Sequence, residues 1–335
     1  MDALALYEKA RAHEGSLAGF YHHNVRVDTD AGPVLVRTPG PGAEPMDLTL
    51  WAETAVLEAI RPYVSSAPRL LHAHADPPFQ IHEFVEGRLV DDLAPGIGTR
   101  VPAAVVGAVE RLFGEMLSVP DTALPAVPSH WPANGDTAAF ALRLLDGVRE
   151  IRGRADAALE GLYQELGVPA DPCRQLAERA AELSARPFRL LHADIHRKNM
   201  ILTEAAEVVF LDWELALWGD PVYDLADHLH KTAYSMADRD RVLAGWQRVA
   251  PQDCRVGWWE GVEYYSAYER MKSAVVDTVR WGRRIARAST GTERTRLADE
   301  LRDKLLRGAP HWGGGAPPAV EEIERAAVRW LGSEG

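Results

Sequence analysis

The stretch "LLHADIHRKNMILTEAAEVVFLDWE" (Leu190–Glu214) decides how this chain is expected to fold and what it is expected to do. The apolar segments "NMILT" and "EVVFLD" predict two short strands joined by the turn "EAAE". Three polar residues, Asp194, Asn199 and Asp212, stand beside or at the ends of these segments. A carboxylate beside a buried strand is unfavourable unless a counter-charge compensates it, so we expect a cation at this place.

The predicted hairpin would bring Asn199 and Asp212 together. If residues 200–203 pair with residues 208–211, these two residues lie side by side at its open end, and the loop with Asp194 lies over them. Carboxylate and amide oxygens are hard ligands that suit Mg²⁺, which leaves its other positions to phosphates and water. A second aspartate that is free of the metal can accept a hydroxyl proton. These are the components of a phosphoryl-transfer site.

The order of these motifs resembles that of a known enzyme family. The pattern HxDxxxxN, followed by a hairpin, "LDWE" and "GDPVYDLA" (219–226), is similar to the aminoglycoside phosphotransferase and choline kinase family. This resemblance implies an α+β, two-lobed protein-kinase-like fold. Residues 1–87 would form a small lobe with an antiparallel sheet and one helix. Residues 88–335 would form a larger helical lobe that carries the catalytic loop, the metal site and the acceptor site.

The resemblance also assigns roles to residues of the opening stretch. Asp194 corresponds to the catalytic base, and Asn199 and Asp212 correspond to the Mg²⁺ ligands. His192 and Asp224 correspond to residues that support the catalytic loop. The implied reaction moves the γ-phosphate of ATP or GTP to a hydroxyl of a small molecule.

The nucleotide site departs from the family pattern in two ways. Arg37 stands where the family has a lysine, and the glutamate expected to hold it is Glu53. Arginine can bind phosphate through two nitrogens, so Arg37 either takes over that role or the role is missing. The segment "EGSLAGFYHHN" (14–24) lacks a full glycine-rich pattern. Its two glycines are Gly15 and Gly19. Further candidates on the nucleotide side are His22, His23 and Asn24 for the phosphates, and Glu83 and Phe84 of the hinge-like "QIHEFVEG" for the base.

Local patterns predict the small lobe in more detail. Residues 13–87 are expected to run β-β-α-β-β, with strands at "NVRVDT" and "PVLVR", a helix over "MDLTLWAETAVLEAI" (46–60), and a second hairpin from Pro68 to Gly87. After residue 101 helices dominate. One of them, "DPCRQLAERAAELSA" (171–185), is expected to start with Asp171 as its N-cap and Pro172 at its first position.

The acceptor site is the least defined. The segment "VGWWEGVEYYSAYERMKSAVVDTVRWGRR" (256–284) is rich in aromatic residues, which indicates either helix packing or a wall on which a ring-bearing substrate stacks. The candidate substrate contacts are Glu214, Trp258, Trp259, Glu263, Tyr268 and Trp281. Likeness to antibiotic phosphotransferases favours an aminoglycoside, basic peptide or nucleoside antibiotic as acceptor. Choline, homoserine or a sugar remain alternatives.

Composition narrows the function class. The net charge of −12 disfavours nucleic acid as a partner and suits a cationic or neutral small substrate. Cys173 and Cys254 form no CxxC pair and provide no metal framework. No apolar run reaches the roughly 18–20 residues of a membrane span. The first fifteen residues predict an amphipathic helix rather than a signal peptide, so we expect a cytoplasmic protein.

Three other hypotheses stay open on the residues alone. His192 and His196 have the HxxxH spacing of a zinc pair, which needs a helix where strand and loop are predicted. Arg37 and the weak glycine pattern would fit a non-catalytic pseudokinase, although Asp194, Asn199 and Asp212 are all present. A metal hydrolase could use the same carboxylates without a nucleotide. The sequence leaves the oligomeric state open.

Overall fold

The computed structural model describes residues 2–12, 22–40 and 48–333. Contacts within the chain divide it into two compact units. Unit 1 takes in Met1–Ser129 and Phe188–Arg255, and unit 2 takes in His130–Pro187 and Val256–Gly335. The small sheet and the catalytic segment therefore belong to the same unit, while the predicted lobe boundary at residue 87 stays a prediction.

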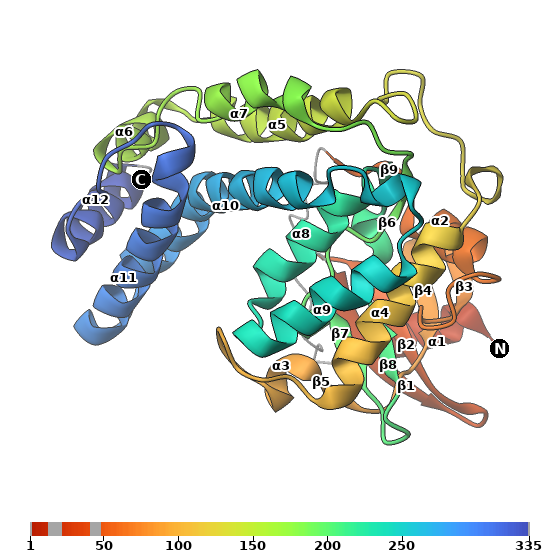
Figure 1. The fold of residues 1–335 in the computed structure, drawn as a ribbon. Coiled ribbons are helices and arrows are strands. Elements are labelled where there is room, and N and C mark those ends of the chain that lie inside the picture. The colour runs from red at the N-terminus through yellow and green to blue at the C-terminus, as the bar shows by residue number, and fades with distance from the viewer. Residues whose placement is uncertain (1, 13–21, 41–47, 334–335) are drawn as a thin grey trace. The chain divides into compact units, whose positions relative to one another are not determined.

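A four-stranded antiparallel sheet opens unit 1, coloured red to orange in Figure 1. Its strands are β1 (His22–Thr29), β2 (Gly32–Pro39), β3 (Leu70–Ala75) and β4 (Pro78–Glu83), in the order β1-β2-β4-β3. With α2 (Glu53–Ile60) between β2 and β3, the predicted β-β-α-β-β order is confirmed. The second hairpin ends at Glu83 rather than Gly87.

The two faces of this sheet have different roles. Side chains alternate along each strand, so one face gathers the valines of β1 and β2 with Phe79 and Ile81 of β4. This face is covered by α1 (Ala3–Arg11), the predicted N-terminal helix, whose Leu6 and Ala10 join the same core. Burial of each large apolar side chain contributes about 1.5–3 kcal/mol. The opposite face carries Arg37, which pairs with Asn24 across β1 and with Gln80 across β4.

Helix α2 is shorter than predicted. It begins at Glu53, and residues 48–52 are not helical, so the prediction of a helix over 46–60 placed its start too early. Trp51 lies at helical spacing from the apolar residues of α2. It is nevertheless buried from the preceding loop, where its indole nitrogen donates to Ala126 O at 3.2 Å. The late start makes Glu53 the first residue of the helix.

The rest of unit 1 combines short strands with three long helices and one short helix. The predicted hairpin is confirmed as β7 (Met200–Leu202) and β8 (Val208–Phe210), which pair antiparallel beside β5 (Arg88–Leu89). A second small sheet pairs β6 (Arg189–Leu191) with β9 (Leu217–Gly219). The helices are α3 (Val90–Leu93), α4 (Ala103–Ser118), α8 (Pro221–Thr232) and α9 (Met236–Val249), and α4 packs against α9 (Figure 1).

Unit 2 is helical in its described residues. It contains α5 (Thr137–Gly153), α6 (Ala157–Glu165), α7 (Arg174–Arg179), α10 (Trp258–Arg287), α11 (Gly291–Gly308) and α12 (Val320–Ser333), with α10 packed against α11 and α12 (Figure 1). The helix predicted from Asp171 is wrong at its start: α7 begins at Arg174 after a turn in which the Asp171 carboxylate accepts from Cys173 N at 3.1 Å. Among the described helices, none combines the length and apolar character needed to cross a membrane.

Candidate active site

The catalytic loop, residues 192–199, connects β6 to β7. Ala193 has a φ of 59°, a left-handed conformation that a residue with a Cβ adopts only when its surroundings enforce it. Asp224 of α8 supplies that constraint, because its carboxylate accepts from His192 N at 2.9 Å and from Ala193 N at 2.8 Å. Asp224 is fully buried, and burial raises its pKa to about 6. The structure thus places Asp224 directly behind the loop, where the sequence predicted a supporting residue.

His192 ties the loop to the neighbouring hairpin. Its Nε2 lies 3.1 Å from Leu211 O, and its ring packs against Trp213 with centroids 4.4 Å apart. Complete burial lowers the pKa of His192 to about 4, so the imidazole is neutral near pH 7. Within residues 2–12, 22–40 and 48–333, no cluster of three His, Cys, Asp or Glu side chains is arranged around a metal position.

The carboxylate of Asp194 is held at both oxygens. Oδ2 accepts from Asn199 Nδ2 at 2.9 Å, and Oδ1 accepts from Lys231 Nζ at 2.8 Å. Burial alone would raise the pKa of Asp194, but the Lys231 ammonium and the nearby His196 outweigh it and hold the pKa well below its usual range. Asp194 is therefore ionised at neutral pH and able to accept a hydrogen bond from a hydroxyl.

Asp212 stands at the end of β8, next to Asn199. Leu211 N donates to Asn199 O at 2.8 Å, so the residue before Asp212 is bonded to Asn199 at the open end of the hairpin. Asp212 has a φ of 67°, a second left-handed residue at the site. The amide nitrogen of Asn199 donates to Asp194, so its carbonyl oxygen is the group that would bind a cation. One carboxylate and one amide oxygen fit Mg²⁺, which takes few protein ligands and completes its shell with water and phosphate.

Arg37 connects the sheet to this end of the hairpin. Its Nη1 donates to both carboxylate oxygens of Glu53, at 2.8 and 2.9 Å, and its Nη2 donates to Asp212 Oδ1 at 3.0 Å. Glu53 also accepts from Trp213 N at 3.1 Å. The Arg37 side chain is only 10% exposed, yet it stays charged because Glu53 and Asp212 raise its pKa against the effect of burial. The ion pair of Arg37 with Glu53 is placed as the sequence predicted, whereas its contact with Asp212 was not foreseen.

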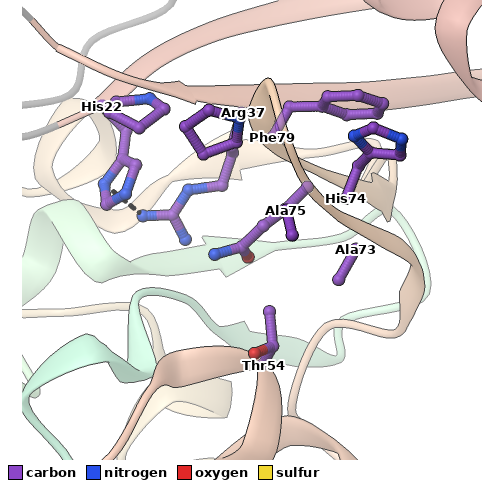
Figure 2. Close-up of a pocket in the computed structure, with 10 residues that line it drawn as sticks. His22, Arg37, Thr54, Ala73, His74, Ala75 and Phe79 are labelled. Atoms are coloured by element: carbon purple, nitrogen blue, oxygen red, sulfur yellow. Dashed lines mark hydrogen bonds between the residues drawn. The ribbon is translucent and has the colours of Figure 1, made fainter.

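A cavity of about 300 Å³ borders the Arg37 side chain. Figure 2 shows Arg37 and His22 on the sheet side of this cavity and Thr54 of α2 on the other side, with the His22–Arg37 hydrogen bond drawn as a dashed line. His22 Nδ1 lies 3.0 Å from Arg37 Nη2 and 3.4 Å from Glu214 Oε2. Burial, together with Asp212, raises the pKa of Glu214 to about 7. Glu214 thus belongs to the charged cluster around Arg37.

The other nucleotide-side candidates are dispersed. Asn24 shares the sheet face of Arg37, whereas His23 points to the opposite face, because neighbouring residues of a strand alternate. Glu83 ends β4 and its carboxylate accepts from Arg69 N at 3.0 Å. The Phe84 ring lies 4.7 Å from the Arg26 guanidinium. Gly15 and Gly19 lie outside the described residues.

The acceptor candidates of unit 2 fall into three places along α10. Trp258 and Trp259 meet edge to face at 5.5 Å in its first turn, where the Trp259 indole donates to Glu263 at 3.1 Å. Tyr268 is buried and its hydroxyl donates to Leu144 O, which is the packing alternative. Trp281 donates to Glu300 of α11 at 3.0 Å. Glu214, the sixth candidate, lies in unit 1 beside His22.

Residues that the sequence analysis missed surround the catalytic loop. Lys231 and His228 of α8 contact it, the latter through Nδ1 at 2.9 Å from Ile195 O. Arg197 is buried within the loop and donates to carbonyls on both sides, including Thr232 O at 2.9 Å and Thr99 O at 3.1 Å. A signal for the α8 residues existed, because Asp224, His228 and Lys231 recur at helical spacing within residues 221–232.

The comparisons with known proteins agree with this geometry. A family model described as "Phosphotransferase enzyme family" matches residues 16–258, and no curated protein is a match. Similar solved structures include the choline kinase LicA from Streptococcus pneumoniae, with a TM-score of 0.56 at 12% identity, covering 90% of this chain and 97% of the other.

Two antibiotic-modifying enzymes are similar to the same extent. The macrolide 2'-phosphotransferase MphH from Brachybacterium faecium has a TM-score of 0.53 at 16% identity, covering 90% of this chain and 98% of its own. An aminoglycoside phosphotransferase APH(4)-Ia variant, in a ternary complex with AMP-PNP and hygromycin B, has a TM-score of 0.52 at 13% identity, covering 88% of this chain and 92% of its own. These likenesses confirm the predicted kinase-like fold. Since the family model spans more than half of the sequence, the chain belongs to the phosphotransferase enzyme family and is a small-molecule kinase.

Proposed function

We propose that this protein is a Mg²⁺-dependent O-phosphotransferase that moves the γ-phosphate of ATP or GTP to a hydroxyl of a small-molecule antibiotic. The observation that carries the proposal is the Asp194 carboxylate, held by Asn199 at 2.9 Å on a loop whose backbone is fixed by Asp224. A fixed, ionised carboxylate at the end of a strand is what a phosphotransferase needs to orient an acceptor hydroxyl.

In the proposed reaction the acceptor hydroxyl donates a hydrogen bond to Asp194. The hydroxyl oxygen forms a bond to the γ-phosphorus, and the bond from that phosphorus to the oxygen bridging it to the β-phosphate breaks. The hydroxyl proton passes to the Asp194 carboxylate, and a nucleoside diphosphate leaves. Catalysis by such a site consists of positioning and electrostatic stabilisation rather than covalent chemistry.

The metal and the phosphates would meet the charged groups next to Asp194. Asn199 and Asp212 would hold Mg²⁺, which supplies charge neutralisation on the phosphates when it is bound. Arg37 would provide the positive charge on the nucleotide side, because its planar guanidinium can serve Glu53 and a phosphate together. Its present contact with Asp212 at 3.0 Å keeps the guanidinium at the edge of the metal site.

Similar solved structures support two candidate classes of acceptor. Macrolide and aminoglycoside phosphotransferases are among the similar structures, one of them with bound hygromycin B, which favours an antibiotic and a role in resistance or self-protection. A metabolic amino-alcohol kinase is the second candidate, because a choline kinase is equally similar. The net charge of −12 suits a cationic acceptor in either case.

A coupled assay of nucleotide turnover tests the proposal. Purified protein is given ATP or GTP with Mg²⁺ and a panel of aminoglycosides, macrolides, basic peptide antibiotics, nucleoside antibiotics, choline and ethanolamine. Turnover stimulated by one antibiotic class, with a mass increase of one phosphate on that compound, is the expected result. Stimulation by choline or ethanolamine alone would overturn the antibiotic role and leave the metabolic kinase. Nucleotide that binds without any Mg²⁺-dependent turnover would favour a pseudokinase.

A further inference from the structure

Lys231 makes more contacts with the catalytic loop than its surface position suggests. Its side chain is 23% exposed, and its ammonium meets three acceptors: Ala193 O at 2.9 Å, Asp194 Oδ1 at 2.8 Å and Asp227 Oδ1 at 2.9 Å. Two of these contacts, with Ala193 O and Asp194 Oδ1, are hydrogen bonds, and the contact with Asp227 is an ion pair. The group is therefore held in one orientation, with one of its bonds directed at the proposed base.

Asp227 anchors this lysine from inside the helix. It lies four residues before Lys231 on α8, and its side chain is fully buried. A buried carboxylate without a counter-ion costs several kcal/mol, so Asp227 keeps Lys231 in place and Lys231 keeps Asp227 compensated. Asp224, one turn before Asp227 on the same helix, fixes the backbone of the loop that carries Asp194. The position of Asp194 therefore depends on α8 through both Asp224 and the pair of Asp227 with Lys231.

The carboxylate of Asp194 is oriented from two sides as a result. Asn199, which comes from the loop itself, takes Oδ2, and Lys231, which comes from α8, takes Oδ1. His196 Nε2 also lies 3.5 Å from Oδ2, and Oδ1 accepts from Lys231 alone among these groups, so a lone pair of Oδ1 can still accept from an acceptor hydroxyl. We infer that Lys231 is a positioning residue that holds the Asp194 carboxylate for the acceptor hydroxyl. This inference rests on the proposed phosphotransferase function.

The test compares kcat and KM of the wild type with those of Lys231→Met. Methionine keeps the aliphatic length and removes the charge. If Lys231 positions the base, kcat falls by a factor on the order of 10², while KM for the nucleotide stays within about threefold. Arg241→Met is the matched control, because Arg241 pairs at 3.3 Å with the equally buried Asp238 on α9, away from the site, and its kcat is expected to stay unchanged.

A second variant covers the case in which Lys231→Met fails to fold. Lys231→Cys is treated with 2-bromoethylamine, whose bromide is displaced by the cysteine sulfur, and the product carries an ammonium at nearly the position of Nζ. The native Cys173 and Cys254 are buried, and burial raises the pKa of Cys173 to about 12 and that of Cys254 to about 11, so wild-type protein should resist the reagent. Recovery of kcat by at least tenfold on alkylation is the expected result.

The outcomes separate the inference from the function on which it rests. An unchanged kcat in a folded Lys231→Met protein would overturn the inference alone. A raised nucleotide KM with unchanged kcat would also overturn the inference, because Lys231 would then bind the nucleotide rather than position Asp194. A folded, alkylated Lys231→Cys protein that stays inactive would do the same. A wild type without any acceptor-stimulated turnover would overturn the proposed function together with the inference.

Discussion

Arg37 is the positively charged residue of the proposed nucleotide side, and it contacts two carboxylates. It stands where the family resemblance implies a lysine, and its two terminal nitrogens serve Glu53 and Asp212 at the same time. A lysine ammonium is a compact point charge and lacks the planar fork that reaches both carboxylates in this way. Arginine at this position therefore contacts both the helix glutamate and Asp212, a proposed Mg²⁺ ligand.

The first prediction concerns the stability that this contact provides. Arg37→Met leaves the nearly buried Glu53 without its partner, so the free energy of unfolding should fall by about 3 kcal/mol. Urea unfolding measures the change. The double variant Arg37→Met with Glu53→Gln removes the buried charge and should recover at least about 1 kcal/mol of the loss.

An exposed ion pair provides the comparison for that experiment. Arg248 pairs with Glu110 at 2.7 Å, but its side chain is 61% exposed, so Arg248→Met should lower the free energy of unfolding far less than Arg37→Met does. Equal losses for Arg37→Met and Arg248→Met would show that the buried position of Arg37 adds nothing to stability.

At the scale of elements, α8 is the support of the catalytic loop. Its residues Asp224, His228 and Lys231 all contact backbone atoms of residues 192–195. Arg197 adds a clamp from within the loop, which links the segment 94–99 to the end of α8. The loop thus acquires its position from elements on both sides rather than from its own conformational preference.

Removal of the clamp should loosen the loop. Arg197→Met leaves several buried carbonyls, among them Thr232 O and Thr99 O, without their donor. We expect the melting temperature to fall by several degrees and amide hydrogen exchange to accelerate in residues 94–99 and 192–199. Exchange that accelerates evenly over unit 1 would instead indicate a general loss of stability without a local clamp.

The buried histidines predict an acid-sensitive fold. Burial lowers the pKa of His192 and of His228 to about 4, against about 6.5 in an unfolded chain. Between these values the unfolded chain binds protons that the folded protein does not, so stability rises with pH from 4 to 6.5 and is lost on acidification. Each histidine contributes about 1.4 kcal/mol per pH unit.

Comparison of variants isolates this contribution from other titrating groups. Asp224 acts in the opposite direction, because burial raises its pKa to about 6 and the folded state then holds its proton. His228→Gln should flatten the dependence of the unfolding free energy on pH between 6.5 and 4.5, whereas His130→Gln at an exposed position should leave it unchanged. Equal slopes for both variants would contradict the assignment of His228 as a buried neutral group.

At the scale of the whole molecule, local sequence patterns predicted helices and strands better than they predicted contacts between distant residues. The strands at "NVRVDT" and "PVLVR" and the β7–β8 hairpin follow from alternation and turn residues, which act over a few positions. The predicted start of α2 was too early, and the predicted helix start at Asp171 was wrong. Trp51 and Asp171 lie in loops, although their positions in the sequence fit a helical pattern. Both errors lie at element ends.

Long-range partners explain what the sequence could not predict in the site. Asp194, Asn199 and Asp212 could be proposed as site residues because they lie in one continuous stretch of sequence, in and around a single hairpin. Arg37 meets Asp212 across 175 positions, and Lys231 meets Asp194 across 37, so no periodicity within either segment encodes these contacts. They arise because the small sheet and the catalytic segment pack in one compact unit.

The most direct measurement on this protein is the turnover of Asp194→Asn, with nucleotide binding determined on the same sample. Asparagine keeps the shape of the side chain and removes the negative charge that would accept the hydroxyl proton. The account predicts that kcat with the best acceptor falls by a factor on the order of 10² or more, while the nucleotide dissociation constant stays within about threefold. Turnover that persists at the wild-type rate would contradict the assignment of Asp194 as the catalytic base.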